Sequence, residues 1–183
     1  MEEEEMIRLA KLNNEEAFEL LVEKYKPIIE KFSFQFGMNQ ENISDVVQET
    51  FIKIHRNLNQ FHTGKLSTWI YQITLNVTRD YYRKRKRDIN LLNKAKKSQL
   101  EIHKETLLFV KEEHVILHEC LQKLKMKHKT PLILFYFHDK SYEEIAVILK
   151  IKLSLVKTRI HQGKKQLREL YDQYERKEVY VNG

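Results

Sequence analysis

Side chains that can hydrogen-bond DNA bases gather between Lys150 and Arg168, a segment with seven lysines or arginines and no acidic residue. On a helix, five of its polar residues would share one stripe, Ser154, Thr158, His161, Gln162 and Lys165, and Lys157 would flank them. Such side chains read base edges in the major groove, while neighbouring cations neutralise phosphates. The pattern therefore predicts a helix that reads duplex DNA, although a solvated amphipathic helix is the simpler alternative.

A helix-turn-helix is the expected support for this stripe. Ser141 and Glu144 have the spacing of a capping box, which predicts the start of a short first helix. A turn is expected over 151–153, with Ser154 capping the second helix. Four residues of that helix would pack on the domain: Val156, Ile160, Gly163 and Leu167.

A second basic region, residues 61–87, combines aromatic, amide and cationic side chains. Gln72, Asn76, Arg79 and Arg83 would share a helical stripe. An unpaired base needs hydrogen-bond donors and an apolar or aromatic wall, so this mixture suits melted DNA. For Trp69, core packing is at least as good an interpretation. The basic run that includes Lys84 could instead be a solubilising helix end whose charge complements the helix dipole.

The whole chain is predicted to be all-α, because its 183 residues include only four glycines and two prolines and show no useful strand alternation. Helical periodicity predicts three helices in the N-terminal half. The first covers 14–36 with a kink or new start at Pro27, the second starts after Asn42 or Ser44 and ends at about 58, and the third covers 68–86. We expect two small helical domains, 1–88 and 113–183, joined by a linker over 89–112.

Composition excludes several classes of protein. The formal net charge of +7 favours a polyanionic partner, and no apolar run approaches the length of a membrane span. The single cysteine, Cys120, excludes an intramolecular disulfide, and no signal peptide is visible, so we expect a cytoplasmic protein without membrane insertion. His114 and His118 near Cys120 are a weak metal signal without a supporting motif. We therefore expect no catalytic residue, metal or cofactor.

The motifs in these two regions, in this order, resemble the sigma-70 family of transcription initiation factors. Residues 45–54, Asp-Val-Val-Gln-Glu-Thr-Phe-Ile-Lys-Ile, resemble region 2.2. Residues 66–73, Leu-Ser-Thr-Trp-Ile-Tyr-Gln-Ile, followed by Asn76, Asp80 and Arg83, are similar to regions 2.3 and 2.4. Residues 131–170 resemble region 4. The short linker leaves no room for regions 1.1 or 3, which is typical of the extracytoplasmic-function type.

The resemblance implies partners and a role for each group of residues. The partners would be promoter DNA, the beta-prime and beta subunits of the bacterial RNA polymerase core, and an anti-sigma factor. The polymerase would meet four residues: Asp45, Gln48, Glu49 and Ile52. The minus-ten element would meet eight: Phe61, His62, Lys65, Trp69, Asn76, Arg79, Arg83 and Lys84. The six polar residues of the second helix, Ser154 to Lys165, would contact the minus-35 element.

Two points stay open at this stage. The turn Lys152-Leu153-Ser154-Leu155 and Gln162 depart from the family's usual residues, which leaves promoter preference undefined. A stand-alone helix-turn-helix regulator would explain residues 141–170 but would leave residues 45–87 without a role.

Overall fold

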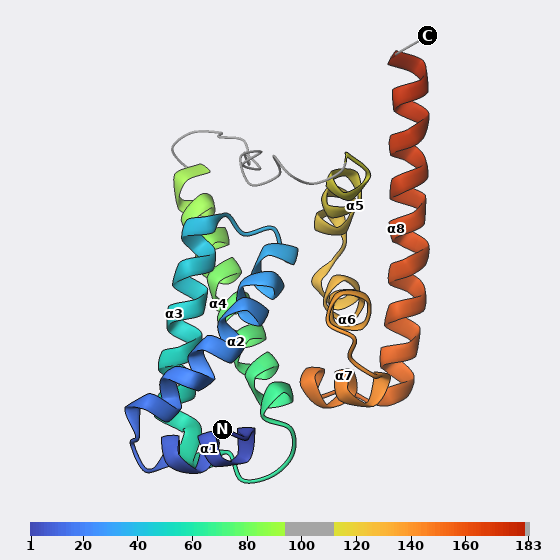
Figure 1. The fold of residues 1–183 in the computed structure, drawn as a ribbon. Helices are drawn as coiled ribbons and strands as arrows, with labels where there is room; N and C mark the ends of the chain where they lie inside the picture. The colour runs from blue at the N-terminus through green and yellow to red at the C-terminus, as the bar shows by residue number, and fades with distance from the viewer. Residues whose placement is uncertain (94–111, 182–183) are drawn as a thin grey trace. The chain divides into compact units, whose positions relative to one another are not determined.

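The apolar stripes of the sequence form helices throughout the described part of the chain. The computed structural model describes the backbone of residues 1–93 and 112–181 and the side chains of residues 1–87 and 115–174. Backbone contacts divide the chain into two compact units, an N-terminal unit with α1 to α4 and a C-terminal unit with α5 to α8. The described elements are all helical, so the predicted all-α class is confirmed (Figure 1).

Three long helices make the core of the N-terminal unit: α2 (Glu15–Gln35), α3 (Gln40–Asn57) and α4 (Leu66–Asn93). They bury aliphatic and aromatic residues at helical spacing, chiefly Leu21, Ile29, Phe32, Ile43, Val46, Ile54, Leu66, Ile70 and Val77. Rings add directional contacts, since Phe32 meets Tyr71 edge-on with 5.5 Å between centroids. Burial of these stripes is the main force that holds the three helices together.

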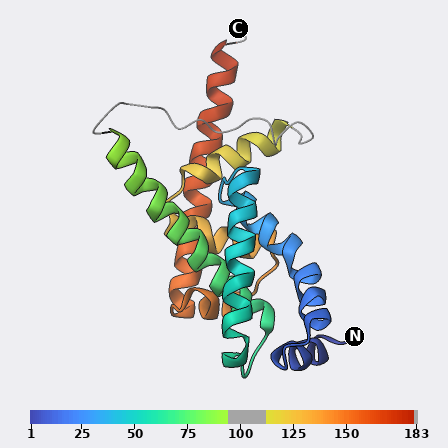
Figure 2. The same cartoon turned by 90° about the vertical axis from the view of Figure 1, so that its left-hand side faces the viewer.

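The chain starts with a helix that the sequence patterns above do not predict, α1 (Glu3–Lys11). Its acidic first turn and basic last turn complement the helix dipole. The Glu3 carboxylate accepts hydrogen bonds at 2.6 Å from the amino group of Lys24 and the hydroxyl of Tyr25 on α2. Figures 1 and 2 show α1 at the end of the unit where α3 ends and α4 begins. It contacts the 3₁₀ turn η1 (Leu58–Gln60) there.

Helix boundaries differ from the expected ones at three places. Pro27 neither ends α2 nor starts a new helix, since it lies at an exposed position inside the continuous helix. Asn39 caps α3 by accepting a hydrogen bond from the backbone of Asn42, so α3 begins before residue 42. The helix expected over 68–86 is longer at both ends, since α4 runs from Leu66 to Asn93. The rest of the expected linker, residues 94–111, lies outside the described residues.

The C-terminal unit consists of α5 (Glu112–Lys123), α6 (Met126–Phe137), α7 (Tyr142–Leu149) and α8 (Leu153–Val181). The long α8 contacts each of the other three, with α7 at one end and α6 and α5 further along it (Figure 1). Its core is aliphatic, with Leu121, Leu132, Ile133, Leu134, Ile145, Val156 and Ile160 buried. At the α5 end, the Tyr174 hydroxyl donates a hydrogen bond to the Glu119 carboxylate.

Candidate nucleic-acid interface

The helix-turn-helix in the C-terminal unit is built from local signals. Ser141 Oγ accepts a hydrogen bond from the Glu144 amide at 3.1 Å, and the Glu144 carboxylate accepts one from the Ser141 amide at 2.9 Å. The predicted capping box is therefore confirmed. Lys150 ends α7 in a left-handed conformation, with φ 55° and ψ 47°, a region that non-glycine residues adopt at a cost of about 1 kcal/mol. This turn redirects the chain into α8.

The two faces of α8 are chemically distinct. Val156 and Ile160 are 0% and 4% exposed, and Gly163 is also buried against α6. A Cβ atom on Gly163 would lie 2.9 Å from Leu132 Cδ1 and 3.2 Å from the His128 carbonyl oxygen, so the glycine allows α6 and α8 to approach closely. The six residues expected to contact DNA are all exposed: Ser154, Lys157, Thr158, His161, Gln162 and Lys165. We call these six residues the recognition stripe.

The expected start of α8 is wrong by two residues, because Ser154 as the cap would place the first helical residue at 155. The helix begins at Leu153, and the backbone amides of Leu155 and Val156 donate to the Lys152 carbonyl. Ser154 therefore lies inside the first turn and does not cap the helix. The Thr158 hydroxyl donates to the Ser154 carbonyl at 3.0 Å, so its lone pairs remain able to accept a hydrogen bond from a ligand.

The surface of α4 in the N-terminal unit has an exposed polar stripe. Asn76, Arg79, Arg83 and Lys84 are exposed, and Gln72 is half-buried. Their spacing puts them opposite buried residues such as Ile70 and Val77, as the sequence indicates. The stripe thus combines an amide with cations on one rigid element.

The loop before α4 separates exposed from packed residues. His62 and Lys65 are exposed, whereas Phe61 is only 9% exposed. The Phe61 ring lies against half-buried Trp69, with 5.6 Å between ring centroids and 38° between their planes. Lys11 of α1 fixes the loop by donating a hydrogen bond to the Phe61 carbonyl, and its amino nitrogen lies 5.8 Å from the centre of that ring. In this conformation the two aromatic residues form the apolar floor of the loop.

A third surface lies on α3. Asp45, Gln48 and Glu49 are exposed and Ile52 is half-buried, so the four residues expected to face a protein partner share one side of the helix. The spacing of three, one and three residues places them on that side. An acidic and amide surface with an apolar edge suits a protein partner better than DNA.

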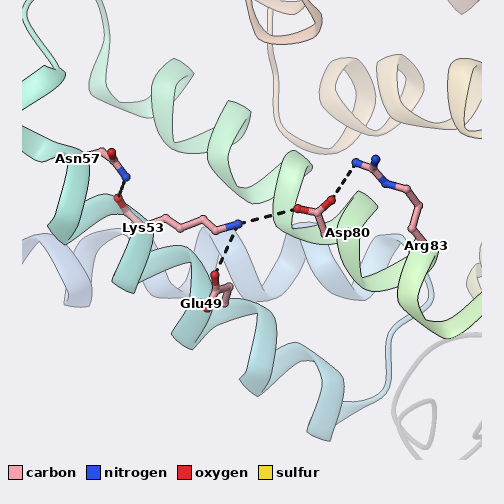
Figure 3. Close-up of polar contacts among 5 residues, drawn as sticks. All are labelled: Glu49, Lys53, Asn57, Asp80 and Arg83. Atoms are coloured by element: carbon pink, nitrogen blue, oxygen red, sulfur yellow. Dashed lines mark hydrogen bonds and ion pairs between the residues drawn. The ribbon is translucent and has the colours of Figure 1, made fainter. Parts of the chain in front are cut away.

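Ion pairs link this side of α3 to the polar stripe of α4, as Figure 3 shows. The Lys53 amino group lies 3.5 Å from the Glu49 carboxylate and 3.9 Å from that of Asp80. Asp80 in turn holds Arg83 at 2.8 Å. Because all four side chains are substantially exposed, each pair contributes about 0–1 kcal/mol. Their effect is to orient Glu49 and Arg83.

Neither Lys53 nor Asp80 is among the residues that the sequence analysis predicts to contact polymerase or DNA. Asp80 lies three residues before Arg83 and Lys53 four after Glu49, which are helical ion-pair spacings readable from sequence. The cross-helix pair between Lys53 and Asp80 has no such signal, because it depends on how α3 packs against α4.

No group of three or more histidine, cysteine, aspartate or glutamate side chains among the described residues could hold a metal ion. Cys120 is buried, and burial raises the pKa of its thiol, which disfavours the reactive thiolate. The side chain of His114 lies outside the described residues. None of the described helices combines the length and the apolar composition that crossing a membrane requires.

Comparison with known proteins finds a family match within each of the two units. Residues 21–88 match the family described as Sigma-70 region 2, and residues 114–167 match Sigma-70, region 4. The extracytoplasmic-function (ECF) RNA polymerase sigma factor SigW of Bacillus subtilis is 32% identical over 174 residues, which cover 89% of this chain and 93% of that protein.

Two solved structures share the fold. CnrH, solved with the cytosolic domain of CnrY, has a TM-score of 0.72 at 24% identity, covering 92% of this chain and 96% of that one. RpoE of Bartonella quintana, solved with the anti-sigma factor NepR, has a TM-score of 0.68 at 23% identity, covering 84% and 93%.

Proposed function

Since this chain belongs to the extracytoplasmic-function type of the sigma-70 family, whose members direct RNA polymerase to promoters, we propose a division of labour between its two units. The N-terminal unit binds core polymerase and the minus-ten element, and the C-terminal unit reads the minus-35 element as duplex. The domains proposed for these tasks are residues 1–88 and 113–183. The observation that carries the proposal is an exposed surface of polar and basic side chains on one helix of each unit.

The recognition stripe on α8 is proposed to enter the major groove at the minus-35 element. Its buried opposite face fixes the helix on α6 and α7, so the stripe is presented without a large ordering cost. Gln162 and His161 offer groups that can discriminate bases, whereas Lys157 and Lys165 are suited to phosphate or guanine.

The α4 stripe and the preceding loop are proposed to hold the minus-ten element. His62, Lys65 and Asn76 would contact an unpaired base above the floor formed by Phe61 and Trp69. Cations on α4 would hold the backbone of the separated strand: Arg79, Arg83 and Lys84. Four residues on α3 are proposed to face the beta-prime subunit of core polymerase: Asp45, Gln48, Glu49 and Ile52.

Other parts of the proposal follow from the family. Sigma factors are not enzymes in the catalytic sense. We propose that this chain performs no reaction of its own and acts in the cytoplasm, where bacterial polymerase works. The structural neighbours CnrH and RpoE were solved with the proteins CnrY and NepR, the second of them an anti-sigma factor. We propose that an anti-sigma factor also binds this chain and covers its functional surfaces.

Reconstitution with bacterial core polymerase tests the proposal. The chain is expected to form a holoenzyme that starts transcripts at defined genomic sites, measured by mapping RNA 5′ ends. Glu49→Lys should weaken holoenzyme formation, because it reverses charge on the exposed side of α3. Glu23→Lys makes the same change at an exposed position of α2 and serves as the control. A wild-type chain without affinity for core polymerase would refute the proposal, and equal affinities of the two variants would refute the assignment of α3.

A further inference from the structure

A cavity of about 430 Å³ lies beside the recognition stripe, within the C-terminal unit. Its walls come from the first turn of α6 and the middle of α8, including Lys125, Lys127, Gln162, Lys165 and Gln166. The sequence patterns do not assign Lys125, Lys127 or Gln166 to any site. Because Gln162 and Lys165 belong to both the cavity and the recognition stripe, the two surfaces are continuous.

The charge of the cavity suits an anion. It has three exposed lysines from two helices, Lys125, Lys127 and Lys165, against one carboxylate, Glu169. The first turn of α6 contains no acidic residue. Within the described part of the chain, none of the three lysines has a carboxylate at ion-pair distance. Like charges that stay clustered without counter-ions repel one another, so an anion in the cavity would relieve the repulsion.

The packing around the cavity holds its two walls at a fixed separation. His128 is 4% exposed, and its Nδ1 atom lies 3.4 Å from the Arg159 carbonyl on α8. Gly163 removes the side chain that would otherwise hold α6 away from α8. The lysines of α6 are therefore brought beside α8 by close helix packing, which sequence spacing does not reveal.

We propose that this cavity receives the sugar-phosphate backbone of the duplex that α8 reads, with Lys125 and Lys127 contacting phosphate groups. The inference rests on the proposed function of α8 and extends its footprint to α6. A duplex with Gln162 and Lys165 in its groove passes the mouth of the cavity, because both residues line it. Lysine is a suitable phosphate ligand, since its amino group is a compact charge with three donors. Glu169 marks the edge of the contact by repelling phosphate.

Salt dependence of DNA binding tests this inference on the full chain. The probe is a fluorescein-labelled 30-base-pair duplex of random sequence, because phosphate contacts carry no sequence information. Each lost contact lowers the slope of log affinity against log salt by about 0.9. The double variant K125A/K127A should therefore lose roughly 1.8 from the slope and, at about 0.15 M salt, bind roughly 30-fold more weakly. The variant K26A/K123A removes two exposed lysines outside the cavity and should keep the wild-type slope.

The outcomes separate failure of the inference from failure of the proposed function. If K125A/K127A keeps the wild-type slope while Lys157→Ala lowers it, the cavity does not hold DNA and the role of α8 stands. If K125A/K127A instead loses affinity for core polymerase, the cavity binds protein and the inference is overturned. If the wild-type chain binds no duplex, either alone or assembled with core polymerase, both ideas fail. Circular dichroism of each variant checks that the helices are retained, as expected for exposed lysines.

Discussion

Replacing Thr78 by valine should stabilise the N-terminal unit, even though it removes a polar group from α4. Thr78 is fully buried in α4, and within the described residues its hydroxyl has no hydrogen-bond partner. Thr74 lies one turn earlier and is 1% exposed, but its hydroxyl donates to the Ile70 carbonyl at 2.9 Å. The two threonines are therefore matched in helix, burial and side-chain shape, and differ in hydrogen bonding.

The magnitude follows from this difference. An unpartnered buried hydroxyl costs about 1–3 kcal/mol, and valine replaces it with a methyl group of similar shape. Thr78→Val should therefore raise the free energy of unfolding by about 1 kcal/mol. Thr74→Val removes a hydrogen bond whose net contribution to stability is about 1 kcal/mol, and burial of the added methyl group offsets part of that loss. The free energies of unfolding of the two variants should differ by about 1–2 kcal/mol. For a unit of about 90 residues, each kcal/mol corresponds to roughly 4–8 °C in Tm.

Fluorescence of Trp69 measures this effect in the right unit. It is the single tryptophan of the chain and packs against the core of the N-terminal unit, so its signal follows that unit during urea or thermal unfolding. A probe of one unit is needed because a chain of two units need not unfold in two states. If Thr78→Val lowered stability as much as Thr74→Val, the Thr78 hydroxyl would have a partner and the reasoning would be refuted.

Three further predictions concern the site and the C-terminal unit. Asn76→Ala should impair open-complex formation more than binding to duplex promoter DNA, measured by permanganate footprinting and by mobility shift; equal losses would remove Asn76 from the base pocket. Burial lowers the pKa of Lys129 to about 8, whereas unfolded lysine titrates near 10.4. The unfolded state thus binds more protons between these values, and stability of the C-terminal unit should rise by up to about 3 kcal/mol from pH 7 to pH 10.5. Lys129→Met should abolish this rise in the circular-dichroism transition of urea unfolding that Trp69 fluorescence does not follow, and an unchanged pH profile would contradict the assignment. Gly163→Ala gains about 1 kcal/mol of helix propensity but overpacks Leu132 at a cost of about 1–3 kcal/mol. The same unfolding measurement should give a net loss of up to about 2 kcal/mol, and a stabilised variant would show that α6 can move away freely.

Local signals in the sequence predicted much of the fold. The capping box of Ser141 and Glu144 and the apolar stripe of Val156, Ile160 and Gly163 depend on residues within one or two turns, and both occur as predicted. The surfaces of α4 and α8 were predictable for the same reason, because a helical period determines which residues share a face.

Features that depend on distant contacts were not predictable in this way. Helix α1 is stabilised by Lys24 and Tyr25, more than ten residues away, and its own nine residues are too few to signal a stable helix. The pair of Lys53 with Asp80 and the placement of Lys125 beside α8 both arise from packing between helices. The expectation that Pro27 could start a new helix was wrong, because buried residues on both sides of it, Tyr25 and Ile29, keep one continuous helix packed on the core.

The separation of α8 into a buried and an exposed face has an evolutionary consequence. Substitutions among the exposed residues change few packed contacts, so under the proposed role of α8 the preferred target sequence could change at nearly constant thermal stability. Duplicated copies could diverge until each ignores the other's targets, while the aliphatic residues beneath stay the same. Two such copies in one genome would then need only a few mutations, all on one side of one helix, to regulate separate sets of targets.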